Sequence, residues 1–236
     1  MSRTAVLFIP FLASAVAAIA CQQVWPAQFW PYALLKPLTT ALVIAYAAGR
    51  GRPGEARRRA LLLGLGLSLG GDVALLWPAQ GFLPGLVAFL AAHLAYLVAF
   101  TRGVRLGASP VAYAGYALLA GSVLAVLWPG VPAGLRVPVA AYVLCLAAMA
   151  AQTASAWRVA RGTPPAAWLR RAALGGLLFL ASDALLAFNR FHTPLPLAGL
   201  LILTTYWAAQ WLIASALPPR DRPQRQPGPG PGPQSL

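Results

Sequence analysis

The sequence predicts an all-α fold, a bundle of about eight transmembrane helices with both termini in the cytoplasm. Composition is the first reason: 59% of the 236 residues are hydrophobic and only 9% are charged, whereas soluble domains carry about 25% charged residues. The second reason is that apolar runs of roughly 18 or more residues, long enough to cross a bilayer, recur along almost the whole chain. The third is the placement of the arginines, which alternates from loop to loop.

Eight apolar segments account for residues 1–217, which we interpret as one transmembrane domain. They are expected at residues 4–21, 30–48, 60–77, 81–100, 109–127, 134–157, 170–188 and 195–217. Only Pro78, Ala79 and Gln80 separate the third segment from the fourth, which predicts a tight helical hairpin. Residues 218–236 are rich in proline, glycine and glutamine, so we expect them to form a disordered cytoplasmic tail.

The basic residues indicate the orientation of the bundle. With eight spans, fifteen arginines fall on the side that carries both termini, and only Arg136 and Arg190 fall on the other. Cytoplasmic loops are enriched in Lys and Arg, so both termini are expected in the cytoplasm. The net charge of +14 therefore indicates topology and attraction to anionic lipid, not binding to nucleic acid. The bias toward Ala, Gly, Pro and Arg is typical of a GC-rich bacterium and predicts the cell inner membrane.

The first segment has a second interpretation. A short basic start and an apolar run ending Ala18-Ile19-Ala20-Cys21 resemble a cleavable signal peptide, which would leave seven spans. The aliphatic residue that usually stands three positions before a lipoprotein cysteine is absent, so we expect the segment to remain as a span. Cys21 and Cys145 are too few for a disulfide framework and are interpreted as packing residues.

Two of the four acidic residues lie inside predicted spans, where a charge costs at least ~2.5–3.5 kcal/mol and is usually functional. Glu55 is in a basic loop and Asp221 in the tail, which leaves Asp72 and Asp183. From the rise of an α-helix, Asp72 is about 18 Å from the cytoplasmic end of its span, and Asp183 is at nearly the same height. Lys36 enters from the opposite face and is about 9 Å deep, roughly level with the aspartates.

Other polar residues are expected near the same layer. His93 and Tyr206 fall near the midplane, while Asn189 and Arg190 fall at the outer end of the seventh span. The functional interpretation is a shared polar cavity. The structural alternative is an ion pair between Lys36 and one aspartate that holds helices together, which would leave the other carboxylate in need of a proton or a partner.

The residues beside the charged positions favour a cavity. Pro37 follows Lys36 and predicts a local break in the second helix, whose freed backbone groups would line the cavity. Gly70-Gly71 and Gly175-Gly176, shortly before the two aspartates, predict close approach between helices.

No metal or other cofactor is expected. The chain has only two histidines, His93 and His192, so a three-histidine zinc site is impossible. A site made from Asp72, Asp183 and His93 is conceivable, but no spacing motif supports it. The sequence contains no HExxH, CxxC, GxSxG or glycine-rich phosphate-binding motif.

Between about residues 30 and 215, five short motifs resemble the YhhN family of integral membrane proteins in their order and spacing. They are Lys36-Pro37-Leu38-Thr39-Thr40, Gly71-Asp72, Phe89 with His93 and Tyr96, Gly175-Gly176 with Phe179 and Ser182-Asp183, and Tyr206 with Gln210, Leu212 and Ile213. The mammalian members are lysoplasmalogenases, which hydrolyse the vinyl ether bond of a lysophospholipid to a fatty aldehyde and glycerophospho-ethanolamine or -choline.

The resemblance implies roles for individual residues. Asp72 and Asp183 match the proposed catalytic aspartates of the family. The supporting or substrate-binding positions are then Lys36, His93, Tyr96, Asn189, Arg190, Tyr206 and Gln210. The implied partners are a lysophospholipid substrate and membrane lipid, and the resemblance leaves the oligomeric state open.

Vinyl ether hydrolysis begins with protonation of carbon, so it needs a proton donor and a carboxylate that activates water. We expect Asp183 to be the acid and Asp72 the base, because Lys36 is expected nearer to Asp72. His93, Tyr206 and Gln210 would orient the water or bind the glycerophosphate. Arg190 is a candidate phosphate anchor, although an ordinary interfacial arginine fits its position equally well.

Three alternatives remain open from the sequence. The protein could be a proton-coupled transporter or lipid carrier that uses the aspartates as proton sites, although no paired broken helices or duplication support this. It could hydrolyse another lysolipid. It could also be a structural or chaperone-like membrane protein in which the aspartates only hold helices together.

Overall fold

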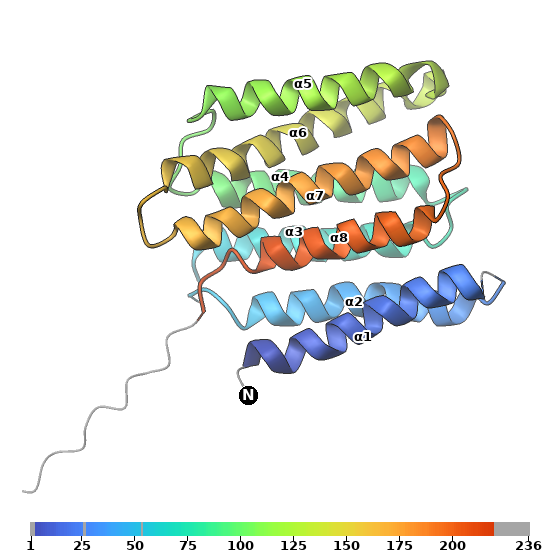
Figure 1. Ribbon diagram of the computed structural model, residues 1–236, viewed down its shortest axis with the longest axis horizontal. Helices are drawn as coiled ribbons and strands as arrows, with labels where there is room; N and C mark the ends of the chain where they lie inside the picture. Colours follow the sequence, from blue (N-terminus) through green and yellow to red (C-terminus); the bar gives the residue numbers. More distant parts are fainter. Residues whose placement is uncertain (1–2, 26, 53, 220–236) are drawn as a thin grey trace, which may run out of the picture.

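The computed structural model describes residues 3–25, 27–52 and 54–219, and this part of the chain folds into eight α-helices (Figure 1). They are α1 (Arg3–Val24), α2 (Phe29–Ala48), α3 (Ala56–Ala74), α4 (Phe82–Thr101), α5 (Pro110–Leu127), α6 (Arg136–Val159), α7 (Ala166–Phe191) and α8 (Ala198–Ala214). Each corresponds to one predicted segment, and the α3–α4 hairpin is confirmed. Most of the predicted tail, with Asp221, lies outside the described residues.

Six of the described helices are long and apolar enough to cross a membrane, namely α1, α2, α4, α5, α6 and α7. Helix α8 is apolar but has only 17 residues. Helix α3 begins at Ala56, four residues before the predicted start of its segment, so three arginines, Arg57 to Arg59, lie in its first turn. The protein is therefore a multi-pass membrane protein.

Six helices form a closed ring, in which α2 contacts α3, α3 contacts α4, α4 contacts α6, α6 contacts α7, α7 contacts α8, and α8 returns to α2. Helix α1 packs outside the ring on α2 and α8, and α5 packs on α6 and α7. Figure 1 shows the helices side by side, with their connections gathered at two opposite ends. This ring positions the polar residues of several helices around one interior space.

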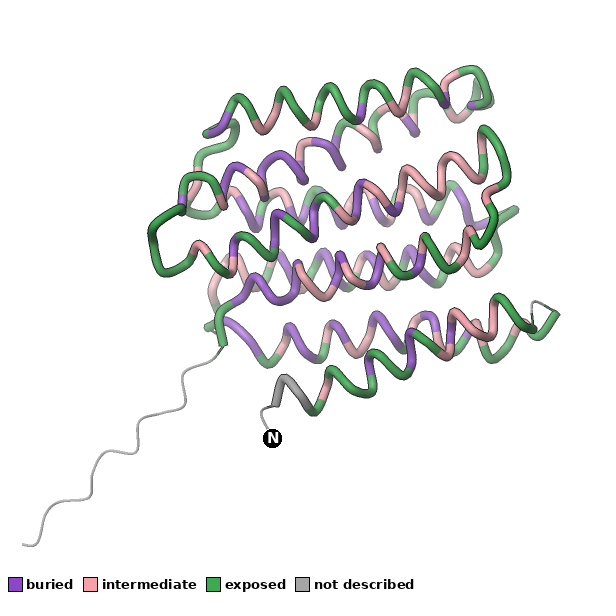
Figure 2. The backbone as a smooth tube through the Cα atoms, viewed as in Figure 1, coloured by how far each residue is buried: buried purple, intermediate pink, exposed green. Residues whose placement is uncertain are grey.

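The surface of the bundle is apolar, as contact with lipid requires. Figure 2 shows α5 exposed along most of its length. Leu118 is 74% exposed, Val137 79% and Leu144 70%. An apolar surface of this extent would be unfavourable in water, whereas lipid chains solvate it without cost.

Helix α1 packs against the ring through polar and aromatic contacts. The Ser14 and Thr39 hydroxyls are 2.8 Å apart, and the rings of Phe11 and Trp211 stack at 4.6 Å. Cys21 and Cys145 are both free. The predicted first span is thus part of the helical bundle.

Arginines at the end of the bundle opposite the α7–α8 connection hold several loops together. Three arginines in the first turn of α3 oppose the helix dipole, and backbone carbonyls compensate. Arg57 donates to the carbonyl of Arg102, and Nε of Arg58 donates to that of Arg50 at 3.0 Å. Nε of Arg50 in turn donates to the Leu217 carbonyl at 2.7 Å, which ties the end of α8 to the α2–α3 loop.

The predicted break at Pro37 is wrong, because α2 is continuous from Phe29 to Ala48. The proline removes only one backbone donor, a loss that transmembrane helices tolerate where neighbouring groups supply other partners. Two residues after the proline, the Thr39 hydroxyl donates to the Leu35 carbonyl at 2.8 Å. Lys36 therefore projects from a regular helix.

The predicted close approach at the glycines is confirmed at three of the four positions. A Cβ on Gly71 would lie 2.5 Å from the Phe89 ring, and one on Gly175 would lie 2.8 Å from Ile213. A Cβ on Gly176 would lie 2.5 Å from the Thr153 hydroxyl, whereas one on Gly70 would meet nothing within 4 Å. Gly71 thus lets α3 lie directly against α4 next to Asp72.

Candidate active site

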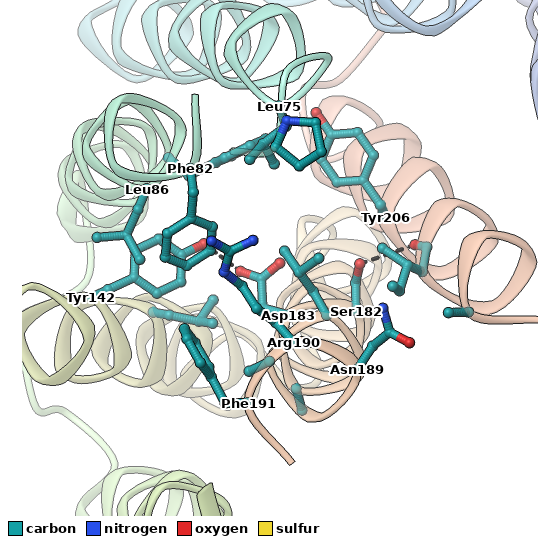
Figure 3. Close-up of a pocket in the computed structure, with 18 of the residues that line it drawn as sticks. Leu75, Phe82, Leu86, Tyr142, Ser182, Asp183, Asn189, Arg190, Phe191 and Tyr206 are labelled. Atoms are coloured by element: carbon teal, nitrogen blue, oxygen red, sulfur yellow. Dashed lines mark hydrogen bonds between the residues drawn. The ribbon is translucent and has the colours of Figure 1, made fainter. Parts of the chain in front are cut away.

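Asp72 and Asp183 line one cavity of about 660 Å³, which is bounded by helices of the ring and by α5. Figure 3 shows Asp183 and Tyr206 among the residues that line it. The lining also includes Lys36 from α2 and Tyr206 from α8. A common chamber is what the cavity interpretation of the two aspartates requires. It also makes the site accessible to a molecule larger than water.

The cavity lies toward the end of the bundle where α7 meets α8. Its wall includes Leu76 from the α3–α4 connection, Phe82 at the start of α4, Phe191 at the end of α7 and Ala198 at the start of α8. Asp72 stands only two residues before the last residue of α3. Asp72 is therefore nearer to the end of its helix than the sequence predicted, because α3 begins and ends earlier than expected.

Asp72 is almost fully buried and is held by three side chains. Its Oδ2 accepts hydrogen bonds from Thr40 Oγ1 at 2.6 Å and from Tyr206 OH at 2.7 Å. Nζ of Lys36 lies 3.9 Å from Oδ1. Two hydroxyl donors and one cation therefore compensate in part for the burial of this carboxylate. The predicted proximity of Lys36 to Asp72 is confirmed.

A second layer of hydrogen bonds holds the donors of Asp72. Nε2 of Gln210 donates to Tyr206 OH at 3.1 Å, and Oε1 of Gln210 accepts from Tyr96 OH at 2.8 Å. Tyr96 OH also lies 3.2 Å from the Ser68 hydroxyl. Gln210 and Tyr96 are fully buried and do not line the cavity. They act on the site by orienting Tyr206.

Asp183 has a different set of partners. Tyr142 OH donates a short hydrogen bond to its Oδ2. Nε2 of His93 lies 3.0 Å from Tyr142 OH and 3.6 Å from the same carboxylate oxygen. Oδ1 of Asp183 has no hydrogen-bond partner among the described residues. This aspartate thus has one oxygen engaged by Tyr142 and the other available to the cavity.

The hydrogen-bond directions imply a proton chain from His93 to Asp183. Tyr142 has a single hydroxyl proton, so when it donates to Asp183 it accepts from Nε2–H of His93. Nδ1 of His93 is buried and has no partner in the described part of the chain. The chain can also run the other way, from a protonated Asp183 through Tyr142 to an unprotonated Nε2. Tyr142 therefore couples the protonation of His93 to that of Asp183.

Aromatic rings separate the Asp72 and Asp183 groups and keep them rigid. The Phe179 ring is buried, with its centroid 4.5 Å from that of His93 and 5.5 Å from that of Tyr206. Phe89 packs edge-on against Tyr206 at 5.8 Å. This packing keeps the partners of Asp72 and the partners of Asp183 in two separate groups beside the same cavity.

Part of the cavity wall is apolar and comes from α5 and α6. Its residues include Val123, Leu124 and Leu127 from α5 and Val139 and Val143 from α6. A cavity with a polar side and a long aliphatic side fits an amphiphile with one hydrocarbon chain.

The predicted site residues divide into two groups. The cavity is lined by Lys36, Asp72, Asp183, Asn189, Arg190 and Tyr206, whereas His93, Tyr96 and Gln210 lie behind it. Asn189 also has a structural contact, because its Oδ1 accepts from the Leu195 backbone at 2.9 Å. The Lys36–Asp72 ion pair of the structural alternative is present, and it coexists with the cavity.

Two functional groups were missed in the sequence. Tyr142 was not singled out, although a tyrosine within a span carries the same signal as Tyr206. Thr40 was noted only as part of a motif, and its bond to Asp72 depends on the packing of α2 against α3. In the described part of the chain, no three His, Cys, Asp or Glu side chains lie close enough together to hold a metal ion. Asp183 and His93 form a pair of such side chains.

Comparison with known proteins agrees with this architecture. The chain is 39% identical over 193 residues to a pig protein named lysoplasmalogenase TMEM86B, covering 78% of this chain and 74% of that one. It is 33% identical to bovine lysoplasmalogenase TMEM86A, covering 81% and 80%, and 31% identical to a lysoplasmalogenase of Mycobacterium tuberculosis, covering 78% and 70%. No solved structure matches the chain. The model of the YhhN family matches residues 32–217, so this chain belongs to the YhhN family.

Proposed function

We propose that this protein is a lysoplasmalogenase of the cell inner membrane, which hydrolyses the vinyl ether bond of lysoplasmalogen with Asp183 as acid and Asp72 as base. The observation that carries the proposal is that both aspartates line one cavity but have different partners. The names of the relatives support the substrate class.

Asp183 begins the reaction by protonating the alkenyl carbon β to the ether oxygen. The π electrons form the new C–H bond, and the oxygen lone pair stabilises the resulting oxocarbenium ion. Oδ1 of Asp183 is the oxygen suited to carry this proton, because Oδ2 accepts from Tyr142. When Asp183 becomes a carboxylate, the Tyr142 hydroxyl stabilises its negative charge.

Asp72 completes the hydration. A water molecule adds to the α carbon and transfers a proton to Asp72, which gives a hemiacetal. The hemiacetal then splits: its hydroxyl proton passes to Asp183, and Asp72 returns its proton to the departing sn-1 oxygen. The products are a fatty aldehyde and the glycerophospho-alcohol, one water is consumed, and both aspartates regain their starting states.

Replacement of either aspartate tests the proposal. In purified protein, Asp72→Asn and Asp183→Asn should each lower aldehyde release from a defined lysoplasmalogen by about 10²- to 10⁴-fold, the usual contribution of a general acid or base. Thermal unfolding in detergent should show that both variants fold. An ester-linked lysophospholipid should release no aldehyde.

Full activity in either variant would remove that aspartate from catalysis. If the wild-type protein instead moves a lipid or protons across sealed vesicles and leaves the vinyl ether intact, the transporter alternative is correct. Cleavage of the ester-linked lipid alone would favour the hydrolase of another lysolipid.

A further inference from the structure

We propose that Arg190 forms a phosphate-binding subsite at the mouth of the cavity, which selects single-chain phospholipids over neutral alkenyl lipids. This inference rests on the proposed function, because it assigns the part of the substrate that lies beyond the vinyl ether. It names one residue for the headgroup and separates that role from the catalytic aspartates.

The guanidinium of Arg190 is held in place but keeps its donors available. It lies over the Phe82 ring at 3.8 Å and 5.8 Å from the centroid of Phe191. Figure 3 shows its side chain pointing into the opening between Phe82 and Asp183. No hydrogen bond or ion pair joins its guanidinium to another residue in the described ranges. Such a planar fork of five donors suits a phosphate, which it can bind with two parallel bonds.

The spacing along α7 matches the length of the substrate. Asp183 and Arg190 are seven residues apart on one continuous helix, so their Cα atoms lie on the same face, close to two turns and about 10 Å apart along the helix axis. In a lysoplasmalogen, seven bonds connect the alkenyl carbon that is protonated to the phosphorus. When this part of the lipid is fully extended, these seven bonds span about 8 Å. A substrate with its vinyl ether at Asp183 therefore places its phosphate beside Arg190.

The other cation of the cavity is already engaged. Lys36 lies 3.9 Å from Asp72, so its charge is balanced by a carboxylate, whereas Arg190 has no such partner among the described lining residues. The charge distribution thus favours the mouth as the place for an anion.

No described carboxylate lies at the mouth of the cavity, so the ammonium group of the headgroup has no acidic partner there. Of the described acids, Asp72 and Asp183 lie deeper in the cavity, and Glu55 lies at the start of α3, toward the opposite end of the bundle. Ethanolamine and choline headgroups should therefore be accepted to a similar degree, because the phosphate they share supplies the recognition.

Arg136 provides a matched control. It belongs to the same end of the bundle, at the start of α6, and its guanidinium lies 5.4 Å from the centroid of the Trp128 ring. Its Nε donates to the Val131 carbonyl at 3.4 Å, and it does not line the cavity. Arg136→Gln removes the same charge from the same surface without touching the proposed subsite.

The experiment compares three substrates: an alkenyl lysophospholipid with choline, one with ethanolamine, and 1-alkenylglycerol, which lacks phosphate. Arg190→Gln should lower kcat/KM for both phospholipids by roughly 10- to 100-fold, mainly through KM, as expected for a lost charge-assisted contact. It should leave 1-alkenylglycerol nearly unchanged. Arg190→Lys should recover part of the loss, and Arg136→Gln should behave as wild type.

A binding measurement separates this inference from the proposed function. A saturated 1-alkyl lysophosphatidylcholine, which has no vinyl ether to cleave, should bind the protein in nanodiscs more tightly than 1-alkylglycerol, and Arg190→Gln should abolish the difference. Equal losses for charged and neutral lipids, or equal effects of the Arg190 and Arg136 replacements, would overturn the subsite. A wild-type protein that releases no aldehyde but still shows the binding difference would refute the enzyme alone.

Discussion

Tyr142 lies between His93 and Asp183, with its hydroxyl 3.0 Å from Nε2 of the histidine. Among the described residues its hydroxyl is the only hydrogen-bond donor to Asp183 Oδ2, and Nε2 of His93 lies 3.6 Å from the same oxygen. Two aspartates of identical chemistry thereby acquire different surroundings, since Asp72 accepts from Thr40 and Tyr206 beside a lysine. At the scale of single residues, the proposed division into acid and base rests on these different partners.

Tyr142→Phe should slow catalysis without weakening substrate binding. The variant loses the donor that stabilises ionised Asp183 and the link to His93, and one such hydrogen bond to a charged group is worth about 1.5–3 kcal/mol. We therefore expect kcat for lysoplasmalogen to fall by roughly 10- to 100-fold with little change in KM.

Tyr113→Phe is the matched control. Tyr113 also donates a hydrogen bond between helices, to Oε1 of Gln152 at 2.8 Å, but it does not line the cavity. Its replacement should leave kcat unchanged. Equal rates for Tyr142→Phe and wild type would show that His93 and Tyr142 serve packing only.

At the scale of helices, the contact between α3 and α4 sets the position of Asp72. Gly71 lies against the Phe89 ring, and a Cβ there would be 2.5 Å from it. Phe89 in turn packs against Tyr206, a donor to Asp72. Any side chain at position 71 therefore displaces the neighbouring aspartate together with its partner.

Gly71→Ala should destabilise the protein by about 1–3 kcal/mol, the usual cost of overpacking, and should lower activity. Gly70→Ala adds the same methyl group where nothing lies within 4 Å, and alanine is the better helix former. It should leave the unfolding temperature in detergent equal or higher. If both alanine variants behave alike, close α3–α4 contact does not control the site.

At the scale of the whole molecule, the cavity and most of the arginines lie at opposite ends. The helix ends beside the cavity carry Arg136 and Arg190, while Arg50, Arg102 and Arg161 belong to connections at the other end. Because cytoplasmic loops are enriched in basic residues, the cavity is predicted to open on the non-cytoplasmic side. Substrate would then enter from the outer leaflet.

Reporter fusions test this orientation. Alkaline phosphatase, which is active only outside the cytoplasm, should be active when inserted in the loop 130–134 and inactive when fused after Leu236. Aldehyde release from lysoplasmalogen added outside should be faster with right-side-out vesicles than with inverted ones. The opposite pattern of reporter activity would reverse the predicted topology and the leaflet of access.

The sequence predicted all eight described helices because their signals are local. An apolar run reveals a span by its length alone, and all eight segments were found. The errors were local too: α3 begins earlier than predicted because its first turn carries arginines, whose charge resembles a loop. Pro37 leaves α2 unbroken, because a single missing donor is tolerated in a transmembrane helix.

The sequence by itself determined the order of the eight described helices and marked Asp72 and Asp183 as exceptional, since a charge in a span is costly wherever it occurs. Only the tertiary structure decided which groups meet them. Thr40 and Tyr206 are 32 and 134 positions from Asp72, and Tyr142 is 41 positions from Asp183. No local pattern specifies such pairs, because they depend on how the helices rotate and pack around the cavity.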